Sequence, residues 1–276
     1  MRLRFGLAAW SNAHFDQGLY PLRTPHAEYL PRYASMFDCV EADILHHRAA
    51  DEVPLDAWAA QTPKGFAFLP KMHKQATHGT KLLPGDDAEP PSPEAAEAAL
   101  DQLEPLAKAK RLGPILLQFP ARFERETGWD HLTQLLALRP PGAFAVEFRH
   151  TSWFADATRN LLEDFDAPLV WSTWPKAFAP PWATASRGYI RFTGKHRHTR
   201  GRHITRADRL DDVLEIRKRL AQTSWKECYV IVTNPFEGNA IDSLPRIAAA
   251  LDGPERGRAF SHEPGQALLR KPATGE

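Results

Sequence analysis

The sequence has few cysteines, no long apolar run and no excess of charge of either sign. Two cysteines, Cys39 and Cys228, are too few for a disulfide scaffold or a cysteine metal site. No segment approaches the roughly 20 apolar residues that cross a membrane, so we expect no membrane partner. The chain has 35 Lys and Arg against 34 Asp and Glu, and its net charge of +1 draws in neither nucleic acid nor an anionic surface.

Cofactor motifs and targeting segments are also missing. The chain contains no Walker-type loop and no Gly-x-Gly-x-x-Gly, so we expect neither a dedicated nucleotide site nor a redox cofactor. Residues 1–10 carry an apolar run shorter than the core of a signal peptide, and the expected location is cytoplasmic. With 43% hydrophobic and 25% charged residues among 276, the composition is that of a globular protein.

Short β-rich segments bounded by turn residues repeat along the chain, with helical stretches between them. The alternation predicts a parallel sheet, and eight units in about 250 residues are typical of a closed (β/α)8 TIM-type barrel. An open doubly wound sheet is the alternative. We expect one barrel domain over residues 1–252 and a flexible tail over residues 253–276. The predicted strands are Leu3–Ala9, Cys39–Ile44, Phe66–Lys71, Ile115–Phe119, Phe144–Arg149, Leu169–Thr173, Tyr189–Thr193 and Cys228–Thr233.

Alternation within these strands separates an apolar face from a mixed face. In Phe144–Arg149, the two phenylalanines and the valine share one side, while Glu147 and Arg149 share the other. In a barrel the apolar face meets the helices and the other face points inward. Polar side chains would then converge near the C-terminal mouth, where barrel enzymes keep their sites.

The same arrangement predicts the state of the cysteines. Cys39 and Cys228 would begin strands that flank the first strand on either side, roughly 9–10 Å apart. That separation exceeds the roughly 7 Å Cα limit for a disulfide. We predict two free, buried thiols.

Characteristic strings end the predicted strands, and the most specific is Glu-Phe-Arg-His-x-Ser-Trp at 147–153. The others are Val40-Glu41, Leu116-Leu117-Gln118-Phe119-Pro120 and Tyr189-Ile190-Arg191-Phe192-Thr193-Gly194, with Gly6 and Trp10, and Lys71 with Thr77-His78, at matching places. Together these blocks resemble those of the YecE-like family, domain of unknown function 72, over residues 3 to 252. The resemblance implies a TIM-type barrel and supplies no reaction.

The chain departs from the family pattern at three strand ends. Leu7-Ala8-Ala9 replaces the usual Thr-Ser-Gly, and Thr233-Asn234 replaces Asn-Asn. Ala42-Asp43-Ile44, followed by His46-His47, replaces Ile-Asn-Ser and an aromatic pair. These changes remove small polar groups and add imidazoles, which leaves open a ligand or an activity different from that of ordinary members.

Charged residues on the inward faces form the candidate site. The candidate catalytic residues are Glu147, Glu41 and Lys71, with either glutamate as a general base. Arg149 and Arg191 would clamp an anion through their planar guanidinium groups. The other candidate substrate-binding residues are Gln118 and Asn234 to orient hydroxyls, Trp10 and Trp153 to wall the pocket, and the histidines His78 and His150.

These residues favour an acid–base enzyme acting on a small anionic, phosphorylated or polyhydroxylated substrate, as a hydrolase, lyase or isomerase. One alternative is a non-catalytic binding barrel, because with Asp43 the inward charges comprise three acids and three bases that can neutralise one another. A second is a nuclease-like or phosphate-backbone binder. It would use residues 187–206, which contain seven Lys or Arg, three His and no acid. The sequence leaves the oligomeric state open.

Histidine patterns do not favour a metal site. His46 and His47 are adjacent and cannot both face one point from a strand. His196 and His198 have a suitable spacing but lie among arginines, which repel cations. We therefore expect no metal. The polar segment 81–93 is expected to form a lid over the mouth or an idle insertion.

Overall fold

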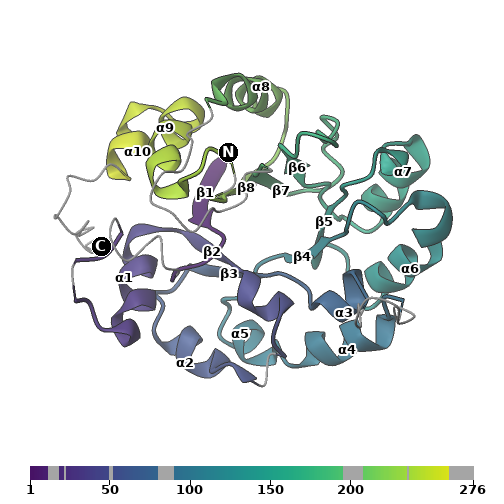
Figure 1. Cartoon of the computed structure of the whole chain (residues 1–276), viewed down its shortest axis with the longest axis horizontal. Helices are drawn as coiled ribbons and strands as arrows, with labels where there is room; N and C mark the ends of the chain where they lie inside the picture. The colour runs from purple at the N-terminus through teal and green to yellow at the C-terminus, as the bar shows by residue number, and fades with distance from the viewer. Residues whose placement is uncertain are drawn as a thin grey trace.

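The computed structural model describes residues 1–11, 19–21, 23–49, 52–79, 90–194, 208–234 and 236–260. The fold is α/β, and parallel strands alternate with helices as predicted, except that no helix lies between the sixth and seventh strands in the described residues 173–187. Figure 1 shows the strands grouped at the centre and the helices arranged outside them. In the described ranges, no helix is long and apolar enough to span a membrane.

Each of the eight predicted strands has a counterpart among the described residues. Every one ends one or two residues earlier than predicted, where the chain turns out of the sheet. After β2, for example, Asp43 opens a short 3-10 helix, η2 (Asp43–His46). The strands are β1 (Arg2–Leu7), β2 (Cys39–Ala42), β3 (Ala67–Pro70), β4 (Ile115–Gln118), β5 (Phe144–Glu147), β6 (Trp171–Ser172), β7 (Gly188–Phe192) and β8 (Glu227–Val232).

The helices lie between the strands and after β8. α4 begins as its sequence predicts: the Ser92 hydroxyl accepts a hydrogen bond from the backbone amide of Ala95 at 3.3 Å, and Pro93 occupies the first turn. The helices are α1 (Tyr29–Met36), α2 (Leu55–Ala60), α3 (Lys74–Thr77), α4 (Pro93–Asp101), α5 (Glu104–Lys108), α6 (Arg125–Ala137), α7 (Asp156–Asp164), α8 (Leu210–Leu220), α9 (Ala240–Asp252) and α10 (Pro254–Ala259), with 3-10 helices η1 (His26–Glu28) and η4 (Thr151–Trp153).

The strands pair in parallel within two sheets. Six strands follow the order β3-β2-β1-β8-β7-β6, and β4 pairs with β5. Isolated parallel bridges join Lys71 to Leu116 and Val146 to Leu169, at the two places where the sheets approach each other. β1 pairs closely with β2 because Gly6 faces Cys39, where a Cβ atom would collide with the Cys39 carbonyl.

Two separate apolar clusters occupy the two faces of the strands, as the alternation predicted. The larger lies against the helices and includes Phe5, Val40, Leu117, Val146 and Ile190. The smaller lies on the opposite face and draws on every strand from β2 to β8 or the residue just before it. Its members are Cys39, Ala67, Leu69, Leu116, Ala145, Val170, Tyr189, Tyr229 and Ile231. The second face is therefore an apolar interior with its own packing.

The packed part of the chain continues beyond the predicted boundary at residue 253. Residues 254–259 form α10, which packs against α9, and Phe260 is buried. The Phe260 ring stacks on Phe37 with centroids 5.5 Å apart and tilts against Phe5 at 5.6 Å. The expectation of a flexible tail from residue 253 is thus wrong for residues 254–260. Because α10 is a single short helix with little apolar periodicity, the sequence pattern did not reveal it.

The thiols are free and buried, and β1 separates the strands that carry them, as predicted. Burial raises the pKa of both Cys39 and Cys228 well above the ordinary value. We therefore expect that iodoacetamide labels neither thiol in the native protein and labels both after unfolding, because the thiolate is the reactive form. Mass spectrometry of labelled protein measures this. An exposed thiol introduced by Ala121→Cys is the positive control, and a native disulfide or rapid native labelling of Cys39 would contradict the strand order.

Candidate functional site

A layer of polar side chains lies directly beyond the apolar interior, at the C-terminal ends of the strands. Each polar residue follows an interior apolar residue by two positions, so the two share a face of the strand. Together they form what we call the strand-end layer. Its members are Glu41, Lys71, Gln118, Glu147, Ser172, Arg191 and Thr233, which follow Cys39, Leu69, Leu116, Ala145, Val170, Tyr189 and Ile231.

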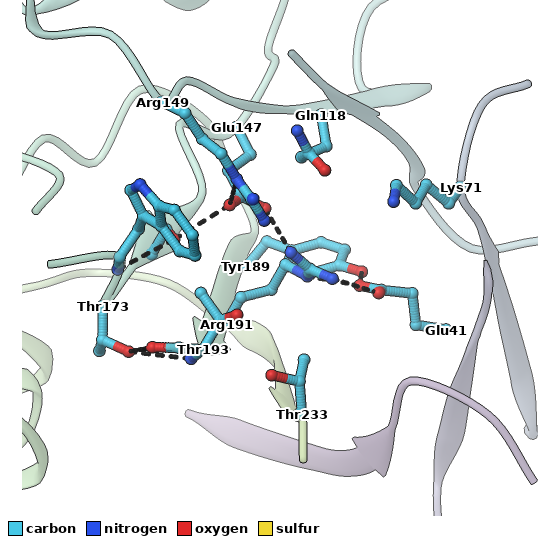
Figure 2. Close-up of polar contacts among 12 residues, drawn as sticks. Glu41, Lys71, Gln118, Glu147, Arg149, Thr173, Tyr189, Arg191, Thr193 and Thr233 are labelled. Carbon is cyan, nitrogen blue, oxygen red and sulfur yellow. Dashed lines mark hydrogen bonds and ion pairs between the residues drawn. The ribbon is translucent and has the colours of Figure 1, made fainter. Parts of the chain in front are cut away.

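Arg191 is the centre of this layer. Its Nη2 and Nε atoms donate to the Oε1 and Oε2 atoms of Glu41 at 2.6 and 2.8 Å, and its Nη1 atom donates to Oε2 of Glu147 at 2.6 Å. Figure 2 shows the guanidinium group of Arg191 between the two carboxylates. Glu41 comes from β2, Glu147 from β5 and Arg191 from β7, and all three are buried. One arginine therefore ties together three strands that are distant in the sequence.

Hydroxyl groups complete the hydrogen bonding of the two buried carboxylates. The Tyr189 hydroxyl donates to Oε2 of Glu41 at 2.9 Å, and the Ser172 hydroxyl donates to Oε1 of Glu147 at 3.1 Å. Burial alone would raise the pKa of Glu147, but Arg191 and then Arg149 outweigh it and hold that pKa below its usual value. Glu147 is consequently ionised at neutral pH and is a weak base.

Arg149 lies at the accessible side of the layer. Its Nε atom donates to Oε1 of Glu147 at 3.3 Å, and its guanidinium group lies over the Trp174 ring, 4.2 Å from the ring centroid. Within the described ranges, neither Nη atom of Arg149 has a hydrogen-bond acceptor. Its side chain is 22% exposed, whereas that of Glu147 is fully buried. Arg149 is thus partly exposed, and Trp174 and Glu147 hold its guanidinium group in place.

Lys71 provides a second accessible cation, at the end of β3. Its Nζ atom lies 3.1 Å from Oδ1 of Asp43, which sits at the start of η2. Burial would raise the pKa of Asp43, but the charge and hydrogen bond of Lys71 lower it overall. In Figure 2 Lys71 lies on the same side of Arg191 as Glu41, and Gln118 lies between Lys71 and Glu147. The Gln118 side chain is buried and its Nε2 donates to the carbonyl of Phe119 at 2.7 Å.

Two histidines flank these cations. His46 is buried in η2, and its ring centroid lies 4.8 Å from that of His78, which follows α3. Arg122 donates to the backbone carbonyl of His78. Among the described residues, no group of three or more His, Cys, Asp or Glu side chains is placed to hold a metal ion.

The structure therefore brings together the predicted residues Glu41, Lys71, Gln118, Glu147, Arg149 and Arg191. The charges of Lys71 and Arg149 also act on the predicted residue His78. The structure changes the expected role of Arg191. The carboxylates of Glu41 and Glu147 occupy its donors, so it is not positioned to clamp a ligand as predicted.

Trp10 and Trp153, which were predicted to line the pocket, lie away from the strand-end layer. The ring of Trp10 packs edge-on against Trp58 and Phe68, at 4.6 and 6.2 Å, in the layer between strands and helices. Trp153 is fully buried in the same layer, and its Nε1 atom donates to a backbone carbonyl at 2.7 Å. Their positions just after strands did not determine the direction in which the indoles turn. The tryptophan that contacts the site is Trp174, in a loop after β6 that carries no periodic signal.

Two further predicted site residues serve the local backbone. The Asn234 side chain accepts from the amide of Ala240 at 3.1 Å, which anchors the start of α9. The His150 side chain accepts from the amide of Ser152 at 3.3 Å at the start of η4. Neither contact connects to Arg191 or Arg149, so the structure does not bring these two side chains into the strand-end layer.

The rim beside β6 and β7 contains an anchoring residue that the sequence did not suggest. Arg209 donates to the backbone carbonyls of Thr193 and Thr173, each at 2.6 Å, and lies 4.6 Å from the ring centroid of Phe236. The Thr173 hydroxyl also donates to the Thr193 carbonyl at 2.9 Å (Figure 2). These bonds hold the ends of the two strands together on the Arg191 side.

Parts of two predicted functional segments lie outside the described residues. Of the basic segment 187–206, the structure describes residues 187–194. Within them, Arg187 donates to the Gly142 carbonyl at 3.1 Å and Arg191 is engaged by carboxylates. Of the segment 81–93, residues 81–89 lie outside the described ranges, as do His196 and His198.

A groove of about 690 Å³ lies at the other end of the strands, where β4 and β5 begin. Its charged lining residues already have partners within the protein. Arg139 pairs with Asp101 at 2.5 Å, and Arg187 is bonded to the Gly142 carbonyl. Size alone therefore does not favour this groove over the strand-end layer, beside which the partly exposed Arg149 has Nη atoms without a described acceptor.

Comparison with known proteins identifies relatives. The family model described as "Protein of unknown function DUF72" matches residues 4–267. UPF0759 protein YecE of Escherichia coli K12 is 34% identical over 132 residues, which cover 46% of this chain and 43% of that protein. The match thus spans less than half of that relative.

Solved structures share the fold. A DUF72 family protein from Thermotoga maritima MSB8 superposes with a TM-score of 0.70 at 23% identity, covering 92% of this chain and 98% of that one. A DUF72 family protein from Enterococcus faecalis V583 gives a TM-score of 0.67 at 20% identity, covering 91% and 98%.

The buried position of Arg191 leads to a stability prediction. We expect Arg191→Met to lower the free energy of unfolding by about 3–5 kcal/mol, because Glu41 and Glu147 would stay buried without their counter-ion. The matched control is Arg159→Met. Arg159 pairs with Glu163 at 2.8 Å on the surface, and its loss should cost less than about 1 kcal/mol. Denaturant unfolding followed by circular dichroism measures both, and equally small losses would contradict the buried ion-pair assignment.

Proposed function

The chain belongs to the DUF72 family of proteins of unknown function, and we propose that it binds a small anion at the C-terminal ends of its strands. The observation that carries the proposal is the environment of Arg149. Its guanidinium group rests on Trp174 and touches buried Glu147 through Nε, and its Nη atoms have no hydrogen-bond acceptor among the described residues. A carboxylate or phosphate group would complete its hydrogen bonds.

We further propose that the two sheets close into one (β/α)8 barrel. β1 and β8 lie between β2 and β7 in the sheet order. In a flat sheet the backbones of Glu41 and Arg191 would therefore lie about 14 Å apart, and their side chains would point in parallel directions. Their 2.6 Å contact supports a strongly curved sheet. The isolated bridges of Lys71 with Leu116 and of Val146 with Leu169 support continuity between the sheets. In such a barrel the strand-end layer would lie at the mouth that barrel enzymes use.

The depth at which the charged side chains lie below the surface supports an anion as the ligand. The carboxylates of Glu41 and Glu147 are fully buried, while the side chains of Lys71 and Arg149 are 11% and 22% exposed. A ligand arriving from solvent would meet Arg149 before the two buried glutamates, and it would meet Lys71 beside Asp43, whose side chain is 41% exposed. Because the Arg149 ring contact and the Lys71–Asp43 pair already orient both cations, little side-chain entropy would be lost on binding.

We propose supporting roles, not proton transfer, for the two buried glutamates. Glu147 has a lowered pKa and is hydrogen-bonded to Arg191, Arg149 and Ser172, so it is a poor general base near neutral pH. Glu41 is held by Arg191 and Tyr189. An acid–base reaction on the bound anion would therefore rely on accessible groups such as Lys71. Hydrolase, lyase and isomerase chemistry all remain compatible with this arrangement.

Isothermal titration calorimetry with inorganic phosphate tests the binding proposal. We expect saturable binding to the wild-type protein and at least about tenfold weaker binding to Arg149→Met, which corresponds to about 1.4 kcal/mol. Arg149→Lys keeps the charge but removes the fork, and it should weaken binding as well. Arg159→Met is the control for a surface arginine and should bind as the wild type does. Equal phosphate binding by wild type and Arg149→Met would contradict the proposal, as would no binding to either.

A further inference from the structure

Two histidines near Lys71, His46 and His78, each have one ring nitrogen in a hydrogen bond and one without a described partner. Nδ1 of His46 lies 2.8 Å from the carbonyl of Met72, so it must carry a hydrogen, and neutral His46 is unprotonated at Nε2. Nδ1 of His78 lies 2.9 Å from the Thr77 hydroxyl. The two rings are 4.8 Å apart at an angle of 73°. His78 is half-buried whereas His46 is buried, so His78 is the one that solvent or a ligand can reach.

His46 of η2 has the strongest charge effect on His78, and three cations follow it. The cations come from three separate elements: Lys71 at the end of β3, Arg122 after β4 and Arg149 after β5. Burial, His46 and these three cations lower the pKa of His78 to about 3. His78 is therefore neutral at physiological pH.

Asp43 is the acid that acts on His46, the partner of His78 in the ring contact, among the described residues. For His46, burial and Lys71 lower the pKa to about 4, His47 acts in the same direction, and Asp43 opposes them. On the far side of α3, His131 of α6 contacts the carbonyl of Ala76 at 2.8 Å. The only acid that acts appreciably on His131 is Glu94 of α4, among the described residues. The cations that act on His78 thus include Lys71 of the strand-end layer and the neighbouring Arg149.

Building on the proposed anion site, we propose that His78 is its proton-accepting group, neutral in the free protein and protonated when a doubly charged anion binds between Lys71 and Arg149. A dianion such as a phosphate monoester or sulfate would offset the cations that disfavour a charged imidazole. A monoanion would offset less of that potential. The site would therefore prefer dianions, and binding would place a proton beside the ligand.

The sign of the pH dependence follows from linkage. Binding raises the pKa of His78 above its value in the free protein, so protonation strengthens the complex. This contribution is complete below the pKa of the free protein and is lost as pH rises through the pKa of the complex. Between those two values, the affinity falls by up to about tenfold per pH unit, since a single proton is taken up.

Calorimetry with sulfate, which stays doubly charged from pH 4 to 8, separates protein titration from ligand titration. Titrations at several pH values in buffers of different ionisation enthalpy give the number of protons taken up. We expect uptake of a fraction of one proton that grows as pH falls below 7, with tighter binding at lower pH. His78→Gln should bind sulfate with the wild-type affinity at pH 8 and without the pH dependence. His131→Gln, which changes a histidine on the neighbouring helix, should keep the wild-type profile.

Nuclear magnetic resonance of the His78 Cε1–H group provides a readout that needs no variant. Its shift should report a neutral ring at pH 5 without sulfate and a protonated ring at saturating sulfate. Sulfate binding without proton uptake, or pH dependence that survives in His78→Gln, would overturn the role of His78 and leave the anion site intact. Absence of sulfate and phosphate binding at every pH would overturn the proposed function and this role together.

Discussion

The buried contact of Arg191 with Glu41 and Glu147 is the interaction on which the rest of the site depends. Removing three charges from water is costly, and the cost is offset only when the geometry is good and the remaining hydrogen bonds are made. The forked contact to Glu41, the bond to Glu147, and the hydroxyls of Tyr189 and Ser172 meet that requirement. Because β2, β5 and β7 each supply one of the charges, the ion pairs also fix the relative positions of these strands.

This contact divides the strand-end layer into a structural level and an accessible level. At the structural level, two carboxylates and one guanidinium group neutralise most of one another's charge, as expected for a plug of ion pairs. At the accessible level, Arg149 and Lys71 are held in fixed orientations by Trp174 and Asp43. Fixed charges of this kind stabilise a bound anion without reorganising first. The ion-pair plug and the proposed ligand site, which were alternatives for the sequence, would thus lie at different depths of the same end of the strands.

Much of this arrangement was predictable, because strand residues alternate between two faces. Alternation located the eight strands and assigned Glu41, Lys71, Glu147 and Arg191 to the face opposite the helices. The same rule could have identified Ser172 and Tyr189, which occupy inward positions of their strands. The ion-pair partners of these residues could not be predicted from the sequence, because the pairing of Arg191 with Glu41 depends on the curvature of the sheet. Trp174 and Arg209 lie in irregular segments without periodicity, and Trp10 and Trp153 follow strands but turn toward the helices.

A double-mutant cycle between Glu41 and Arg191 tests the central contact most directly. The free energy of unfolding would be measured for wild type, Glu41→Gln, Arg191→Met and the double variant. If the two side chains meet across the interior, the double variant loses less stability than the sum of the single losses, by about 1–3 kcal/mol. Losses that add to within about 0.5 kcal/mol would mean that the two side chains are not in contact, and the strands would then not converge around Arg191.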